Sequence, residues 1–186
     1  MKSIKSIQTY FRGYKFRSRL EARWAVYFDA LGIEWEYEPE GFDLGDAGWY
    51  LPDFYLPELD AWIEIKPKNG DRKEVFDQLV GMMRAGAAEH GRAWGLFGDP
   101  LDHKWMMPTL YESRANIKQA PGWYDEWGEC SIEFHKDDDG WFVLTGFGMQ
   151  DLKSWVFKNG GLKDAIVNYS EKQKARSARF EHGETP

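Results

Sequence analysis

The sequence contains a single cysteine, and this scarcity argues against several classes of protein. Cys130 alone cannot form an internal disulfide or a zinc site built from several thiolates. Histidine is also sparse, and its four positions do not have the spacing of metal ligands: His90, His103, His135 and His182. Disulfide redox chemistry and structural zinc binding are therefore disfavoured.

Long hydrophobic runs are also missing. No stretch reaches the roughly 20 apolar residues that a membrane-spanning helix needs. The basic start at Lys2 and Lys5 continues into polar residues without the apolar segment of a signal peptide. We therefore expect a soluble, cytoplasmic protein with no membrane partner. With 186 residues, of which 42% are hydrophobic, the chain is long enough for one domain, or one domain with an extension.

The charges are strongly segregated along the chain. The net charge is −7, but residues 1–28 carry seven Lys or Arg and one acid, Glu21. Residues 29–64 then contain eleven acids and no Lys or Arg, whereas residues 152–186 sum to +3. An acidic stretch between basic ends is compatible with solvated faces, and also with a protein whose ends contact phosphate groups.

Hydrophobic periodicity predicts an α/β core in about the first hundred residues. Ser18–Leu31 has helical spacing, with Gly32 as its terminating residue, and Asp71–His90 is a second amphipathic helix that begins with an Asp71 cap. Alternating or apolar runs predict strands. These strands are Glu34–Glu38, Trp49–Tyr55, Ala61–Lys66 and Ala93–Phe97. The resulting order is helix, three strands, helix, strand. We expect four tryptophans of this region to pack in the core: Trp24, Trp35, Trp49 and Trp62.

Two further elements are expected beyond this core. Ser131–His135 and Trp141–Thr145 flank a polar turn and predict a β-hairpin. Leu162 to about Arg179 predicts a helix whose one side is basic, through Lys172, Arg176 and Arg179. We therefore divide the chain into a core domain (1–98), an aromatic-rich hairpin elaboration (99–150) and a basic C-terminal helix with a tail (151–186).

The hairpin formed by the second and third strands predicts a cluster of charged side chains. A symmetric turn between Glu58 and Leu59 places Asp53 opposite Glu64, and strand alternation puts Lys66 on the same face as Glu64. Two opposed carboxylates repel each other unless a cation lies between them, and their oxygens suit Mg²⁺ or Mn²⁺ better than zinc. The alternative is that Glu64 simply pairs with Lys66 at a solvated edge.

Glu21 admits two interpretations. Ser18 and Glu21 have the spacing of a capping box, in which the glutamate returns to the backbone amide at the start of the helix. Glu21 is also the one acid in a basic segment, so it can instead reach a shared cation while its neighbours hold phosphate. These neighbours are Lys15, Arg17, Arg19 and Arg23.

The motif and the element order together resemble the PD-(D/E)XK nuclease superfamily. The motif consists of Pro52-Asp53 on one strand and Glu64-Ile65-Lys66 on the next, after a helix that bears Glu21. The resemblance covers roughly residues 10–98 and is closest to compact phage endonucleases and to the nuclease domain of Tn7-type transposases. It implies a restriction-endonuclease-like αβββαβ core with a mixed central sheet, followed here by a C-terminal α+β elaboration.

The resemblance also implies a function and roles for individual residues. Asp53 and Glu64 are expected to bind Mg²⁺ or Mn²⁺, with the Ile65 carbonyl as a further ligand, and Glu21 is expected to bind a metal or its water. Lys66 is expected to orient the attacking water. The residues expected along the approach of the DNA are Lys68, Lys73 and Gln78.

Three alternatives stay open at this point. The chain is a metal-dependent DNA endonuclease, or a catalytically silent or partner-dependent DNA-binding and assembly module on the same fold, or an α/β interaction protein with an accidental motif. Cleavage of both strands requires two active sites. The expected partners are therefore DNA together with a second copy of the chain or a larger nucleoprotein complex.

Overall fold

One mixed sheet dominates the computed structural model. The structure describes residues 7–88, 92–106, 109–113, 116–120, 132–137, 140–145, 148–150, 157–158 and 169–180. The five strands of the main sheet are, in spatial order, β3 (Glu36–Tyr37), β6 (Phe54–Leu56), β7 (Ala61–Lys66), β8 (Ala93–Asp99) and β9 (Asp102–Met106). β7 and β8 run parallel, and the other neighbours are antiparallel. The described part has three α-helices, so the predicted α/β class is confirmed.

The remaining elements are short strands, three α-helices and two 3-10 helices, η1 (Gly45–Ala47) and η2 (Pro57–Leu59). The strands form small antiparallel sheets outside the main one. They are β1 (Thr9–Phe11), β2 (Tyr14–Phe16), β4 (Phe42–Asp43), β5 (Trp49–Tyr50), β10 (Thr109–Ser113), β11 (Asn116–Ala120), β12 (Ile132–Asp137), β13 (Gly140–Thr145), β14 (Gly148–Gln150) and β15 (Phe157–Lys158). The α-helices are α1 (Arg19–Leu31), α2 (Arg72–Arg84) and α3 (Tyr169–Ser177). No helix in the described stretches is long and apolar enough to cross a membrane.

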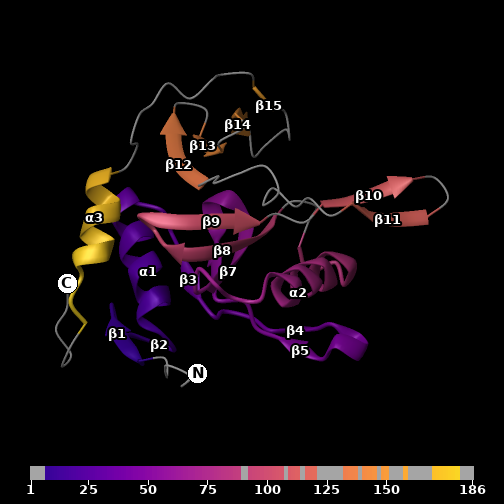
Figure 1. Ribbon diagram of the computed structural model, residues 1–186, viewed down its shortest axis with the longest axis horizontal. Coiled ribbons are helices and arrows are strands. Elements are labelled where there is room, and N and C mark those ends of the chain that lie inside the picture. The colour runs from indigo at the N-terminus through magenta and orange to yellow at the C-terminus, as the bar shows by residue number, and fades with distance from the viewer. Residues whose placement is uncertain are drawn as a thin grey trace.

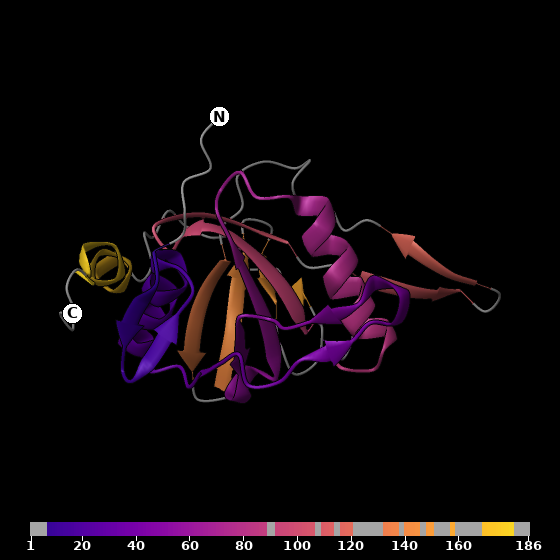
Figure 2. The same ribbon diagram turned by 90° about the horizontal axis from the view of Figure 1, so that it is seen from below.

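α1 and α2 cover opposite faces of the main sheet (Figures 1 and 2). Successive strand residues point to opposite faces, and the buried side chains of β7 divide accordingly. Ile63 and Ile65 pack with α1 in one apolar cluster, whereas Trp62 packs with α2 in another. Because β7 and β8 are parallel, the chain must cross over between them, and α2 lies in this connection.

Local capping signals place both helices. The Ser18 side chain caps α1, and Gly32 ends it in the left-handed region at φ 75°, as predicted. The Asp71 side chain caps α2 and accepts from the Glu74 amide, also as predicted. The prediction that α2 reaches His90 is wrong, because the helix ends at Arg84. Its periodicity continues in the sequence, but Gly86 adopts φ 72° and turns the chain away.

Two predicted strands are shorter than expected. Trp49–Tyr55 is not one strand, because β5 pairs with β4 outside the main sheet and only β6 joins it. Pro52 lies at the break, where it has no N–H to donate to a ladder. Glu34–Glu38 is reduced to β3, and Glu38 itself has φ 47°. The short β4–β5 hairpin leaves Trp49 72% exposed, so its predicted core position is wrong.

The C-terminal part of the chain adds a hairpin and a helix to this core. β12 and β13 pair as predicted, with Asp137 opposite Gly140, and the turn residues 138–139 lie outside the described residues. The predicted helix is described only from Tyr169 to Ser177, where α3 packs against α1 (Figure 1). The predicted basic stripe is wrong, because Lys172 is buried and Arg179 follows the end of the helix.

Candidate active site

Asp53 lies where β6 and β7 separate. The register pairs Phe54 with Ile63 and Leu56 with Ala61, which confirms the predicted turn symmetry. The ladder begins at Phe54, directly after Asp53, so the aspartate does not form a ladder pair with Glu64. Its Oδ2 instead accepts a hydrogen bond of 2.7 Å from the Ile65 amide, and the side chain is buried. The strands therefore hold the Asp53 carboxylate directly beside β7.

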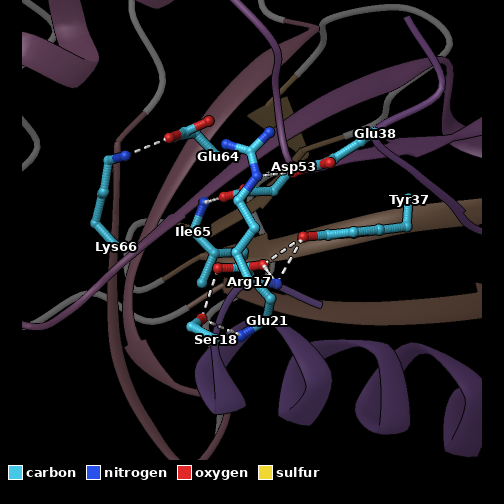
Figure 3. Close-up of polar contacts among 9 residues, drawn as sticks. All are labelled: Arg17, Ser18, Glu21, Tyr37, Glu38, Asp53, Glu64, Ile65 and Lys66. Carbon is cyan, nitrogen blue, oxygen red and sulfur yellow. Dashed lines mark hydrogen bonds and ion pairs between the residues drawn. The ribbon is translucent and has the colours of Figure 1, made fainter. Parts of the chain in front are cut away.

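Glu64 and Lys66 lie next to each other on β7, as strand alternation predicted. The Lys66 Nζ is 2.6 Å from the Glu64 Oε1 (Figure 3). The other oxygen, Oε2, accepts a hydrogen bond of 2.7 Å from the Tyr50 hydroxyl. Glu64 is only 3% exposed, whereas the Lys66 side chain is 30% exposed. The lysine therefore connects a buried carboxylate with the solvent.

Glu21 joins the site from α1. Its Oε1 accepts a hydrogen bond of 2.6 Å from the Ser18 hydroxyl, and its Oε2 accepts from the Tyr37 hydroxyl and the Arg17 amide, at 2.6 and 3.1 Å (Figure 3). The Glu21 amide donates to the Ser18 oxygen, so the first half of the predicted capping box is present. The glutamate side chain contacts the Ser18 hydroxyl in place of the Ser18 amide, and it is buried.

The three acids interact electrostatically. Burial raises the pKa of Asp53 well above its usual range, and the negative charges of Glu64 and Glu21 add to this increase. Burial also raises the pKa of Glu64, although Lys66 and Tyr50 oppose the increase. The Asp53 and Glu64 carboxylates are thus costly to ionise in the protein alone. A bound cation would favour the ionised forms of these two groups.

The buried acids also shift the pKa values of Lys66, Tyr50 and Tyr37. Burial lowers the pKa of Lys66, but attraction by Glu64 outweighs this and the net direction is upward. Burial and the Glu64 charge raise the pKa of Tyr50 well above its usual value. Burial and the hydrogen bond to Glu21 likewise raise the pKa of Tyr37. Lys66 is therefore a cation at neutral pH, and both tyrosines are neutral hydrogen-bond donors.

The donor set fits a small divalent cation. It consists of carboxylate oxygens, which magnesium and manganese prefer. Within the described residues, the Asp53 Oδ1 accepts no hydrogen bond, so one buried carboxylate has an oxygen left for an ion. No group of three or more acidic, histidine or cysteine side chains in the described ranges is already gathered as a metal-binding cluster. Glu21 and Glu64 are instead held by Ser18, Tyr37, Tyr50 and Lys66, which an incoming ion must compete with.

The residues predicted along the DNA approach are engaged with acids. Each contacts an acidic side chain on the surface. The pairs are Lys68 with Asp102, Lys73 with Asp77, and Gln78 with Glu74. Exposed pairs of this kind contribute little to stability, about 0–1 kcal/mol, so a phosphate group can exchange with the carboxylate. Their role in DNA binding stays a prediction.

The basic N-terminal residues occupy three different places. Arg17 lies near the acids, and its Nε is 2.6 Å from the Glu38 Oε1 (Figure 3). Burial lowers the pKa of Arg17, but the charge of Glu38, with a smaller contribution from Asp53, outweighs this and the net direction is upward. Lys15 lies over the Tyr10 ring, 6.0 Å from its centroid. Arg19 and Arg23 lie on another side of α1 and line a hollow there.

Sequence reasoning missed the two tyrosines that hold the glutamates. Tyr37 and Tyr50 lie in strands whose alternation indicates which side chains are buried, but not which acid each hydroxyl reaches. The one signal in the sequence is that Tyr50 lies close to the motif, directly before Leu51. The structure adds that Tyr50 is buried although Trp49 next to it is exposed. Its bond to Glu64 depends on the packing of β5 against the sheet.

Replacing Tyr50 by phenylalanine is expected to destabilise the protein. The change leaves the buried Glu64 Oε2 without its donor, which costs about 1–3 kcal/mol. For a chain of this size, each kcal/mol lowers the melting temperature (Tm) by about 2–4 °C. Thermal unfolding in EDTA checks the effect. Tyr55→Phe is the matched control, because its hydroxyl bonds to Asp60 on the surface, and an equal loss in both variants would contradict the prediction.

Comparison of the chain with protein-family models, curated proteins and solved structures finds no match. The residues of this site therefore provide the evidence for a function. These are the buried acids Glu21, Asp53 and Glu64, the partly exposed Lys66, and the tyrosines that position two of the acids.

Proposed function

We propose that the protein is a metal-dependent DNA endonuclease with a restriction-endonuclease-like core, related to the PD-(D/E)XK superfamily. The observation that carries the proposal is that the described acids Asp53, Glu64 and Glu21 are all buried and close enough for their charges to repel one another, although they are not already gathered as a metal-binding cluster. The element order supports it, since α1 precedes the antiparallel strands β3, β6 and β7, and α2 then leads to the parallel strand β8.

The three acids and one backbone carbonyl form the proposed metal site. Asp53 and Glu64 would hold Mg²⁺ or Mn²⁺, together with the carbonyl of Ile65, and Glu21 would bind the ion or one of its waters. The bound ion supplies Lewis-acid activation of water and neutralises charge on the phosphate. The Ile65 amide fixes the Asp53 carboxylate, and Tyr50 fixes Glu64, so both acids keep their orientation before an ion arrives.

Lys66 is suited to the attacking side of the reaction. Its ammonium group lies 2.6 Å from Glu64 and is partly exposed, so it can reach a water molecule beside the site. In the proposed reaction, a water oxygen bonds to phosphorus, the bond from phosphorus to one ester oxygen breaks, and a proton passes to the leaving oxygen. Lys66 would orient the water and stabilise the negative charge that develops on the phosphate.

A second candidate function is favoured by one observation. Glu21 and Glu64 are already hydrogen-bonded, and Lys66 is paired with Glu64, so two of the three acids have partners without an ion. Such a site is compatible with a DNA-binding or assembly module that needs a partner protein to become active. The intact set of Asp53, Glu64 and Lys66 favours the endonuclease.

Metal removal tests the proposal. Supercoiled plasmid and a branched DNA are incubated with the protein in Mg²⁺, in Mn²⁺ and in EDTA. We expect cutting in both metals and none in EDTA, since the water and the phosphate charge both depend on the ion. Isothermal titration with Mn²⁺ accompanies the assay. Cutting that persists in EDTA, or an absence of Mn²⁺ binding, would contradict the endonuclease, whereas Mn²⁺ binding without any cutting would favour the partner-dependent module.

A further inference from the structure

A hollow lined by three arginines lies beside α1, apart from the acidic site. Its volume is about 330 Å³, and its lining consists of Arg19, Arg23, Ala178, Arg179 and Phe180. We call it the arginine pocket. None of the described residues that line it is acidic.

The position of the arginine pocket follows from the helical repeat of α1. Arg19 and Arg23 are four residues apart and therefore lie on the same side of the helix. Glu21 is two residues from each, so it points to nearly the opposite side, toward Tyr37 and the acidic site. One helix thus carries the arginine pocket on one side and a proposed metal ligand on the other.

Packing between distant parts of the chain fixes the third arginine. Phe180 is buried and meets Phe11 edge-to-face, with ring centroids 6.4 Å apart. Ala175 on α3 is fully buried in the same cluster as α1 (Figure 2 shows the two helices side by side). Arg179 is adjacent to this anchor, so the chain places it in the lining of the same hollow as Arg19 and Arg23.

Arg23 also has an unsatisfied donor. Its Nε is buried and has no hydrogen-bond partner within the described residues. A buried donor without an acceptor is costly, so a small shift of the Arg23 side chain toward an anion in the arginine pocket would be favourable. Guanidinium groups bind phosphate through paired N–H donors, which makes phosphate the best-suited anion.

We propose that the arginine pocket binds a backbone phosphate of DNA outside the bond that is cut. This inference rests on the proposed function, because it assigns the bound polyanion to the substrate of the acidic site. A DNA strand is an extended chain of phosphates, so it can contact both sides of α1 at once. The partly exposed side chain of Ala178 provides an apolar surface for the adjoining sugar.

Duplex binding in EDTA tests this assignment without cleavage. Fluorescence anisotropy compares the wild type with Arg23→Gln and Arg179→Gln over a series of salt concentrations. Loss of one charge-assisted phosphate contact is expected to weaken binding about tenfold. The slope of log affinity against log salt should decrease by about 1. Arg84→Gln is the matched control, because Arg84 is an exposed arginine on α2, and circular dichroism verifies that each variant is folded.

A second measurement separates DNA from a free anion. Pyrophosphate is added to the wild type and to Arg179→Gln, and thermal unfolding is recorded. Protection of the wild type but not of the variant, together with the loss of duplex affinity, supports the assignment. Unchanged duplex affinity and salt slope in Arg23→Gln and Arg179→Gln would overturn it, and pyrophosphate protection in that case would indicate a pocket for a small free anion.

The outcomes also separate this inference from the proposed function. Weaker duplex binding in Arg179→Gln, in a protein that never cuts DNA in Mn²⁺, would support the arginine pocket and contradict the endonuclease. Metal-dependent cutting with unchanged duplex affinity in the arginine variants would support the endonuclease and contradict the arginine pocket.

Discussion

Replacing Asp53 by asparagine should abolish metal-dependent cleavage and, at the same time, stabilise the protein in EDTA. The amide keeps an oxygen that can accept the Ile65 N–H bond, so the local geometry is preserved. It removes a buried negative charge that Glu64 and Glu21 repel. If about 1 kcal/mol of repulsion and desolvation is relieved, the Tm in EDTA increases by about 2–4 °C.

Which of the two proteins is more stable should therefore depend on metal: the variant in EDTA and the wild type in Mn²⁺. Mn²⁺ that binds only the folded wild type stabilises it by about 2.7 kcal/mol at one hundred times the dissociation constant. Asp53→Asn should lose this protection together with cleavage. Thermal unfolding with Mn²⁺ and with EDTA measures both effects, and Asp46→Asn is the matched control on an exposed aspartate. Equal Mn²⁺ protection in Asp53→Asn and the wild type would refute the metal assignment.

The pH dependence of stability has a definite sign. Because the pKa of Asp53 is higher in the folded than in the unfolded protein, the folded state binds more protons above the ordinary value of 3.8. In EDTA, the free energy of unfolding should therefore fall as the pH increases from that value through the raised pKa. Asp53→Asn should reduce this fall, and denaturant unfolding at several pH values measures the difference.

Replacing Lys66 by alanine should remove cleavage while metal binding persists. A lysine that orients the attacking water and stabilises developing charge contributes about 10²–10⁴-fold to the rate. The Asp53 and Glu64 carboxylates remain, so isothermal titration should still detect Mn²⁺. Cleavage of plasmid by Lys66→Ala within tenfold of the wild type would contradict this role.

Stability provides a second measure of the Lys66 change. Without the ammonium group, the buried Glu64 loses the charged partner at its Oε1. A buried carboxylate without its partner destabilises the folded protein, and Mn²⁺ should restore part of the loss by replacing the missing positive charge. Lys174→Ala is the control, since Lys174 is exposed on α3 and should affect neither the Tm nor the metal response.

Much of the acidic site was predictable because its determinants are local. The caps of α1 and α2 and the alternation of β7 depend on neighbouring residues, and they placed Glu21, Glu64 and Lys66 correctly on their elements. The hairpin register followed from the turn symmetry. These features required no knowledge of contacts between distant segments.

The errors arose where distant packing overrides local pattern. Trp49 alternates like a strand residue of the core, but the break at Pro52 moves it into the β4–β5 hairpin and leaves it exposed. Lys172 has the spacing of an exposed basic stripe, yet it is buried on α3, the helix that packs against α1. The hydroxyl bonds of Tyr37 and Tyr50 depend on how strands outside the motif pack against it.

The contact between α3 and α1 also determines when the apolar core around α1 can be completed during synthesis. Ala175 and Phe180 belong to the same apolar cluster as α1, although about 150 residues separate them in the chain. At about 5–20 residues per second, a ribosome needs roughly 8–30 s to make that intervening stretch. During this interval the nascent chain exposes part of the α1 surface. Although α1 is made long before α3, it is therefore fully enclosed only after α3 has been made.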